Sequence, residues 1–268
     1  MPRHCYVLRV FTRGDEGGNH LGVVTDVTGL TTRSMQAIAV DLGFSETIFL
    51  EWEAGEIPRV RIFTPGAELP FAGHPLVGMA WTLKQLGPGG PDTLRCPAFE
   101  VTIRLIGEDA VVDVPLDQPV RPAPQAGSLA RAVGLPEPVS ARWVNMPVPY
   151  LLIEAESPAA VSAAIPASEG TFQEIGADMI YVYAFESSEA VRARFFAPGH
   201  GVFEDPATGS AAVALAAALR SEGQTSGRLA ISQGSEIGHP SAINLEWQDE
   251  RASIGGAVRK DEVRWLEI

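Results

Sequence analysis

The chain has 268 residues, of which 46% are apolar and 20% are charged. This composition is typical of a globular protein with one large or two modest domains, and it excludes a disordered chain. The formal charge of -13 argues against nucleic acid or an anionic membrane surface as a partner, because both need clustered Lys and Arg. We find neither a signal peptide nor an uncharged apolar run of about 18 residues, and we therefore expect a cytoplasmic protein without a membrane span.

The cysteines and one histidine bear on metal binding. Cys5 and Cys96 are too few and too scattered for a disulfide framework or a metal knuckle, and we interpret them as structural thiols. His200 lies close to Glu204 and Asp205, which is compatible with a metal site. Because no second histidine stands at ligand spacing, we predict that no metal binds there.

The first half of the chain predicts two helices and several strands. Thr31 or Thr32 is placed to cap a helix that Gly43 ends, and the apolar residues between them repeat at helical spacing. A second helix follows Gly73, and its apolar residues on nearly every face predict a buried element. Runs of β-branched and aromatic residues predict strands at 6–12, 23–25, 46–52, 60–63, 99–105 and 110–116.

Four prolines between residues 115 and 124 divide the chain, because proline cannot continue a helix or sit inside a sheet. We therefore predict a first domain at 1–117, a proline-rich linker at 118–127 and a second domain at 128–268. In the second domain we expect helices at 128–135, 157–165 and 211–219. Strands are expected at 141–146, 150–156, 179–186 and 191–196, near Leu229, and at 243–247 and 252–254.

Residues 61–83 and 195–219 look like two copies of one pattern. In each, an apolar run ends at an aromatic residue with a proline two positions later, and a loop with an acid, a glycine and a helix of small residues follow. Gly73 and Gly209, the aligned glycines, lie about half the chain length apart. The repeat predicts two similar halves that meet at a shared site.

The two predicted helix starts suit anion binding. The first N–H groups of a helix are unpaired and its dipole favours negative charge, and Gly73 and Gly209 would let a substrate oxygen approach the backbone closely. Two facing helix starts would hold a carboxylate between them. The alternative is that both glycines only serve tight turns.

Glu46 is the candidate proton-transfer group. It stands at the mouth of a predicted strand, flanked by Phe44 and Phe49. Desolvation there would raise its proton affinity, which suits a group that takes and returns a proton. The alternative is an exposed charge at a strand end.

Three further polar residues stand near the two helix starts. His74 precedes Pro75 in a first helical turn, where it can donate to a substrate or relay a proton, or simply cap and pack. Asp205 can bind a substrate amine or hydroxyl or orient His74, although a turn before a proline also explains it. Ser210 can add a hydroxyl to the carboxylate site or act as an N-cap.

Four motifs occur in order: GNHLGVVTD (18–26), GFSETIFL (43–50), RIFTPGAELPFAGHPLVGMAW (61–81) and EDPATGSAA (204–212). Together they resemble the PhzF-like (phenazine biosynthesis-like) family, which is related in fold to diaminopimelate epimerase. The resemblance implies an α+β fold of two pseudo-symmetric domains, each a curled, mostly antiparallel sheet around a central buried helix. It implies isomerisation by proton transfer in the cleft between them, without a cofactor and commonly in a homodimer. It assigns catalysis to Glu46, His74 and Asp205, and substrate binding to Gly73, Gly209 and Ser210.

The chain departs from the related epimerases and racemases, which use two cysteines on opposite sides of the reacting carbon. By resemblance, the matching positions here are Ala72 and Thr208, so we do not expect a two-thiol racemase. We predict instead an isomerase that moves a proton on a small carboxylated metabolite with one carboxylate. Two alternatives remain at this point: a non-catalytic metabolite-binding protein on the same fold, and an epimerase or lyase with bases other than cysteine.

Overall fold

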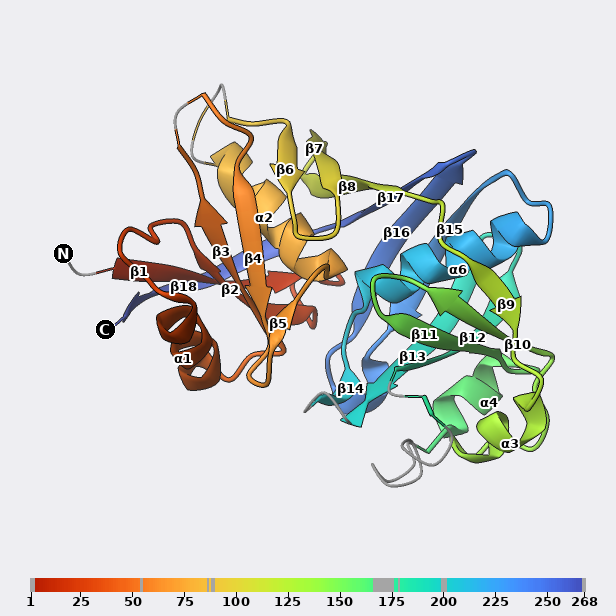
Figure 1. Cartoon of the computed structure of the whole chain (residues 1–268). Coiled ribbons are helices and arrows are strands. Elements are labelled where there is room, and N and C mark those ends of the chain that lie inside the picture. Colours follow the sequence, from red (N-terminus) through yellow and green to blue (C-terminus); the bar gives the residue numbers. More distant parts are fainter. Residues whose placement is uncertain are drawn as a thin grey trace.

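A computed structural model describes residues 3–53, 55–85, 87, 90–165, 176–177, 179–198 and 202–266. The molecule has two halves side by side, and in each a curled sheet surrounds one buried helix, α2 (Gly73–Gln85) or α6 (Gly209–Ser221) (Figure 1). This is the α+β fold that we expected. Within the described residues no helix has the length and apolar character needed to cross a membrane.

The remaining elements pack around these two helices. The other helices are α1 (Thr32–Leu42), α3 (Ala126–Arg131) and α4 (Pro158–Ala163), with a 3-10 turn η2 (Ser235–Ile237). The strands are β1 (Arg3–Val10), β2 (Asn19–Val24), β3 (Glu46–Glu51), β4 (Arg59–Phe63), β5 (Glu68–Leu69), β6 (Thr93–Arg95), β7 (Glu100–Ile106), β8 (Asp109–Pro115), β9 (Val120–Pro122), β10 (Ser140–Asn145), β11 (Pro149–Glu154), β12 (Ile180–Ser187), β13 (Ala190–Ala197), β14 (Val202–Asp205), β15 (Ser226–Gln233), β16 (Ser241–Gln248), β17 (Arg251–Gly256) and β18 (Val258–Leu266).

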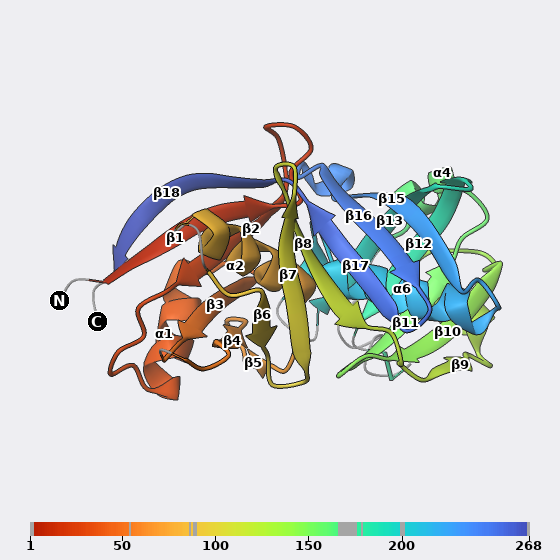
Figure 2. The ribbon, with the colours of Figure 1, turned by 90° about the horizontal axis from the view of Figure 1, so that it is seen from above.

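The same strand pairing occurs twice. β2 is parallel to β3 as β11 is parallel to β12, and β4 is parallel to β6 as β13 is parallel to β15. The two halves are joined where β8 pairs with β17, and Figure 2 shows the resulting continuous row of β7, β8, β17 and β16. The internal repeat seen in the sequence is therefore a repeat of topology.

The two halves exchange one strand each: the strand that comes after one half in the sequence pairs with a strand of the other half. β9 follows β8 but pairs with β10, and β18 follows β17 but pairs with β1. The expectation that the segment at 118–127 stays outside the sheet is wrong at β9, because its one proline, Pro122, lies on an edge strand, where the missing N–H is tolerated. The strand β18 was not expected at all. The domain limits 1–117 and 128–268 stay a prediction.

Capping residues at both ends of α1 determine where β3, the strand that carries Glu46, begins. Thr31 Oγ1 accepts a hydrogen bond from Ser34 N at 3.2 Å, and Gly43 ends α1 in the left-handed conformation with φ 66°, as expected. The chain turns directly from α1 into β3. Phe49 then packs under α1, while the alternate residue Ile48 faces the core around α2. Glu46, the first residue of β3, stands two positions before Ile48 and therefore lies on the same face of the strand, between the halves.

The N-termini of α2 and α6 touch each other. A Cβ atom added to Gly73 would lie 2.7 Å from Gly209 C and from Ser210 N, both backbone atoms. Neither Gly73 nor Gly209 has a positive φ. These glycines are therefore required by the contact between the helices, and not by a tight turn.

We predict that Gly73→Ala destabilises the protein by about 1–3 kcal/mol, because the new methyl group must push two helix ends apart. Denaturant unfolding measures the loss. The matched control is Gly66→Ala, in the loop before α2, where an added Cβ would contact only Thr64 Oγ1, at 3.7 Å. Equal stability of the two variants would contradict this account of the glycines.

Candidate active site

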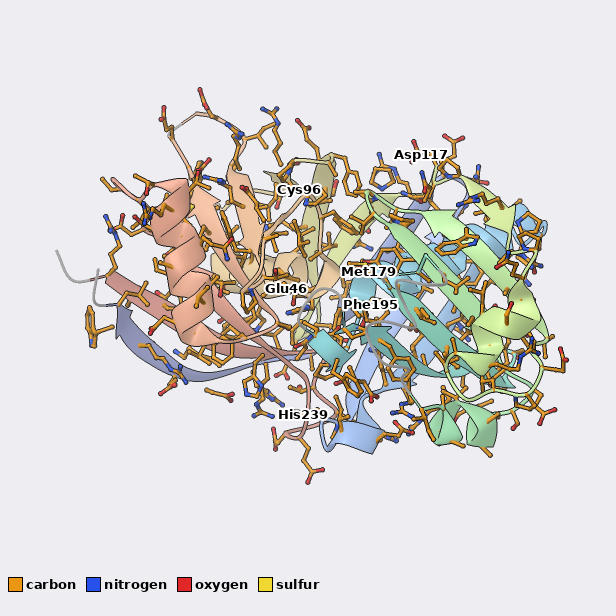
Figure 3. The ribbon with its side chains drawn as sticks, turned by 60° about the horizontal axis from the view of Figure 1, so that its bottom comes forward. Glu46, Cys96, Asp117, Met179, Phe195 and His239 are labelled. Carbon is orange, nitrogen blue, oxygen red and sulfur yellow. The ribbon has the colours of Figure 1, made fainter. Side chains whose placement is uncertain are left out.

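The structure brings the three predicted catalytic residues together between the halves. Glu46 begins β3, His74 is the second residue of α2 and Asp205 ends β14. His74 and Asp205 are buried, and the Glu46 side chain is 15% exposed. Glu46 Oε2 lies 3.5 Å from His74 Nε2. Figure 3 shows Glu46 where the halves meet, beside Met179 and Phe195 of the second half.

A small cavity of about 40 Å³ lies between these groups. This volume holds about one water molecule, so a larger ligand requires its walls to move apart. Its apolar wall comes from both halves and its polar groups are a minority. The described residues that line it are Glu46, Thr64, Leu69, Phe71, Ala72, Val148, Tyr150, Met179, Phe195, Ala197, Val202, Asp205, Thr208 and Ser210.

Two carboxyl groups with raised pKa values face this cavity. Burial and the charge of Asp205 raise the pKa of Glu46 from 4.5 to about 8, and the nearby hydroxyl of Ser45 opposes this rise. Burial also raises the pKa of Asp205 from 3.8 to about 6, although hydrogen bonds from Thr208 and Asn19 lower it. Of the two carboxyl groups, Glu46 is therefore the one whose surroundings favour the protonated form more strongly.

His74 is neutral in this site. Burial lowers its pKa from 6.5 to about 3, against a backbone hydrogen bond with His20 that raises it. Its contact with Glu46 is consequently not an ion pair at neutral pH. A neutral imidazole in this place can donate or accept one hydrogen bond.

Asn19 connects the candidate catalytic residues, and the sequence analysis did not single it out. Its Nδ2 atom donates to Asp205 Oδ1 at 2.8 Å and lies 3.3 Å from His74 Nδ1. Its Oδ1 atom accepts from Ser45 Oγ at 2.9 Å. The only sequence signal was its place in the GNHLGVVTD motif.

Thr208 and Gln233 hold the other side of Asp205. Thr208 Oγ1 donates to Asp205 Oδ2 at 2.6 Å. Gln233, which is 0% exposed, donates from Nε2 to Thr208 Oγ1 and to Asp205 O, at 2.9 and 2.7 Å. No sequence signal marked Gln233, because it lies in β15, far along the chain from the motif that it supports.

Ser210 is not an N-cap. It is the second residue of α6, and its hydroxyl is 2.9 Å from the hydroxyl of Tyr150, which also lines the cavity. Tyr150 is the second residue of β11, and it lies outside the sequence motifs. The pair places two hydroxyl groups beside the start of α6.

The cysteines lie elsewhere. Ala72 and Thr208, the positions that resemblance matched to the epimerase cysteines, both precede a helix and line the cavity. Cys5 and Cys96 are buried in other parts of the core, and burial raises the pKa of both thiols.

Metal ligands are not gathered at this site. Among the described residues, no three His, Cys, Asp or Glu side chains form a group that fits a metal ion. His200, which we weighed as a ligand, lies outside the described residues.

The duplicated halves differ at the acid/base position. In the parallel pair β2–β3, Leu21 lies opposite Glu46. In the second half, Ile180 of β12 packs on the outer side of the sheet with α3 and α4, and the residue that faces the cavity at this place is Met179. The counterpart of Glu46 is therefore the apolar Met179, and the second carboxyl group of the site, Asp205, comes from β14.

Known proteins match this chain over almost its whole length. The family model described as phenazine biosynthesis-like protein matches residues 8–259. A protein of Mesorhizobium japonicum named as an uncharacterized isomerase is 34% identical over 95% of this chain and 94% of its own. The trans-2,3-dihydro-3-hydroxyanthranilate isomerase of Pseudomonas aeruginosa is 33% identical over 93% of each chain. A crystal structure of a PhzF family protein from Enterococcus faecalis covers 100% of both chains with a TM-score of 0.84 and 22% identity.

The family model and these relatives define an isomerase. The chain belongs to the phenazine biosynthesis-like (PhzF) family.

The raised pKa of Glu46 predicts a pH-dependent stability difference. The folded protein binds a proton on Glu46 that the unfolded chain releases near pH 4.5, so stability falls as pH rises from about 4.5 to 8. Glu46→Gln removes this loss. We expect the variant to exceed the wild type by about 2–4 kcal/mol at pH 9 and to differ little at pH 5.

Denaturant unfolding at the two pH values measures this difference. Glu51→Gln, at the partly exposed opposite end of the same strand, is the control for changing a glutamate to glutamine. A constant difference between Glu46→Gln and the wild type across this pH range would show that Glu46 is not desolvated.

Proposed function

We propose that the protein is a cofactor-independent isomerase that moves a proton on a small carboxylated metabolite by general acid/base catalysis in the cleft between its halves. The observation that carries the proposal is the Glu46 carboxyl group, which lines the cavity and whose buried Oε2 atom has no hydrogen-bond partner in the part of the chain that the structure describes. A group that must exchange protons with a substrate needs such a free oxygen.

The reaction needs only one carboxylate. Ionised Glu46 removes a proton from a carbon atom conjugated with the substrate carboxyl group, and the C–H electrons enter the conjugated system. Protonated Glu46 then delivers the proton to another carbon, so that a double bond moves and no atom is gained or lost. A carboxyl pKa of about 8 is close to the working pH, which suits a group that acts as base and acid in turn.

The charge that develops on the substrate needs donors. We assign this role to the helix starts at Gly73 and Gly209, where first-turn N–H groups and the helix dipoles favour an anion. Ser210 lies at the same place and can add its hydroxyl. His74, 3.5 Å from Glu46, can donate to the substrate or relay the proton.

The difference between the halves supports transfer on one face. Inversion of a carbon centre by two bases would need a second acid/base group at the counterpart of Glu46, but Met179 occupies that position in the cavity wall. Ala72 and Thr208 likewise supply no thiol. These residues favour a double-bond shift over epimerisation.

The substrate class follows from the wall of the cavity and from the relatives. The wall is largely apolar, which suits a small cyclic or unsaturated acid. Relatives from Pseudomonas species are named as trans-2,3-dihydro-3-hydroxyanthranilate isomerases. We propose this compound and small cyclic carboxylic acids like it as the first substrates to test.

We predict that the wild type incorporates deuterium from D2O into such an acid, and that Glu46→Gln lowers the rate about 10³-fold while the ligand still binds. Mass spectrometry follows deuterium and a thermal shift follows binding. Glu51→Gln is the control and should keep the wild-type rate.

Each other outcome points to a different function. Retained activity in Glu46→Gln would overturn the assignment of the base. A thermal shift without deuterium incorporation by the wild type would indicate a binding protein. A product with one inverted centre would indicate an epimerase.

We further propose that the protein acts as a homodimer, as its family resemblance implies, and that it is cytoplasmic. Light scattering should give about twice the 28.5 kDa of one chain. A molecular mass near one chain would contradict the dimer.

A further inference from the structure

Asn19 occupies the centre of the buried polar cluster. It is 2% exposed and stands at the first position of β2. Its side chain contacts Ser45, which precedes Glu46, and also His74 and Asp205. It therefore links the acid/base residues of the first half with the carboxylate of the second half.

The orientation of this amide is determined by its neighbours. Nδ2 lies within hydrogen-bond distance of Asp205 Oδ1 and of the carbonyl oxygen of Ala207, at 2.8 and 3.2 Å. A flipped amide would place its oxygen against both of these acceptors. Asn19 therefore acts as a donor toward Asp205.

The second oxygen of Asp205 also receives a donor. Thr208 Oγ1 is itself the acceptor of a hydrogen bond from Gln233 Nε2, so its single proton is directed to Asp205 Oδ2. With a donor on each oxygen, the ionised form of Asp205 is favoured. A proton on Asp205 would have to displace one of these donors.

The surroundings of Glu46 favour its protonated form instead. Its Oε2 atom is buried without a hydrogen-bond partner among the described residues, and the single hydroxyl proton of the adjacent Ser45 is donated to Asn19 Oδ1. The negative charge of Asp205 further disfavours ionisation of Glu46. Of two neighbouring buried carboxyl groups, the one with more donors takes the charge and the other keeps the proton.

We propose that Asn19 is a positioning residue that keeps the negative charge on Asp205 and thereby leaves the transferable proton on Glu46. The proposal rests on the proposed function in one respect, namely that Glu46 is the group that exchanges the proton with substrate.

Other charged and titratable groups around Asp205 do not supply this effect. Glu204, the preceding residue, favours protonation of Asp205, and its own charge is paired with Arg194 at 2.7 Å. His74 is neutral, and burial raises the pKa of Tyr150, so its hydroxyl keeps its proton. The donors that favour ionised Asp205 are therefore the neutral side chains of Asn19 and Thr208.

The test is the titration of Asp205 in the whole protein without ligand. Aspartate labelled with ¹³C at the side-chain carboxyl is followed by NMR, and its Asp205 signal is assigned with Asp205→Asn. All measurements use Glu46→Gln as the background, so that Asp205 titrates without its coupled partner. Adding Asn19→Ala should raise the midpoint of Asp205 by about one to two pH units, the size expected for a lost hydrogen bond to a charge.

Two further variants make the test specific. Asn19→Asp keeps the shape of the side chain but replaces the donor with a carboxyl group, and it should raise the midpoint at least as far. It also serves if Asn19→Ala does not fold. The matched control is Asn244→Ala, which removes an exposed asparagine that donates to Asp109 at 3.2 Å and lies outside the cavity lining. It should leave Asp205 unchanged.

An unchanged Asp205 midpoint in a folded Asn19 variant would overturn the proposal, because a merely structural role for Asn19 lowers stability without moving this titration. A shift of equal size in Asn244→Ala would also overturn it. The titration needs no substrate, so its failure is separate from failure of the proposed isomerisation, which the deuterium experiment measures.

Discussion

The close contact between the starts of α2 and α6 is the constraint on which the rest of the structure depends. At Gly73 the backbone of the other helix leaves no space for a side chain, and at Gly209 an added Cβ would lie 3.0 Å from Ile254 Cδ1 and 3.3 Å from Gly73 Cα. The flanking residues are consequently brought to one point: His74 from one helix start and Asp205 from the strand before the other. Both sheets curl around these helices, so β3 delivers Glu46 to the same place.

The site concentrates negative charge without a neighbouring cation. Among the described residues that line the cavity there is no Lys or Arg. Neutral donors stabilise the ionised form of Asp205 instead. The negative charge of Asp205 then raises the pKa of Glu46. Burial and this repulsion together bring a carboxyl group, normally ionised at neutral pH, into the range where it can both accept and release a proton.

Local patterns predicted the elements whose stability is local. The helix between Thr31 and Gly43 has both caps where the sequence indicated them, and the strand at Glu46 begins where expected. The strands that the sequence did not predict are β5, β6, β9, β14 and β18. Among them, β9 and β18 exist because a partner strand from the other half is available. Their pairing depends on how the repeated halves exchange strands, which no short window of sequence contains.

The sequence by itself determined the repeated pattern, the family resemblance and the candidate residues Glu46, His74 and Asp205, because each of these lies within a short contiguous motif. Only the tertiary structure decided what surrounds them. Asn19 and Asp205 are 186 positions apart, and Gly73 meets Gly209 across the junction of the halves. Hydrogen bonds and backbone contacts over such separations follow from the packing of two complete sheets. For this reason only the tertiary structure reveals Asn19 and Thr208 as hydrogen-bond donors to Asp205.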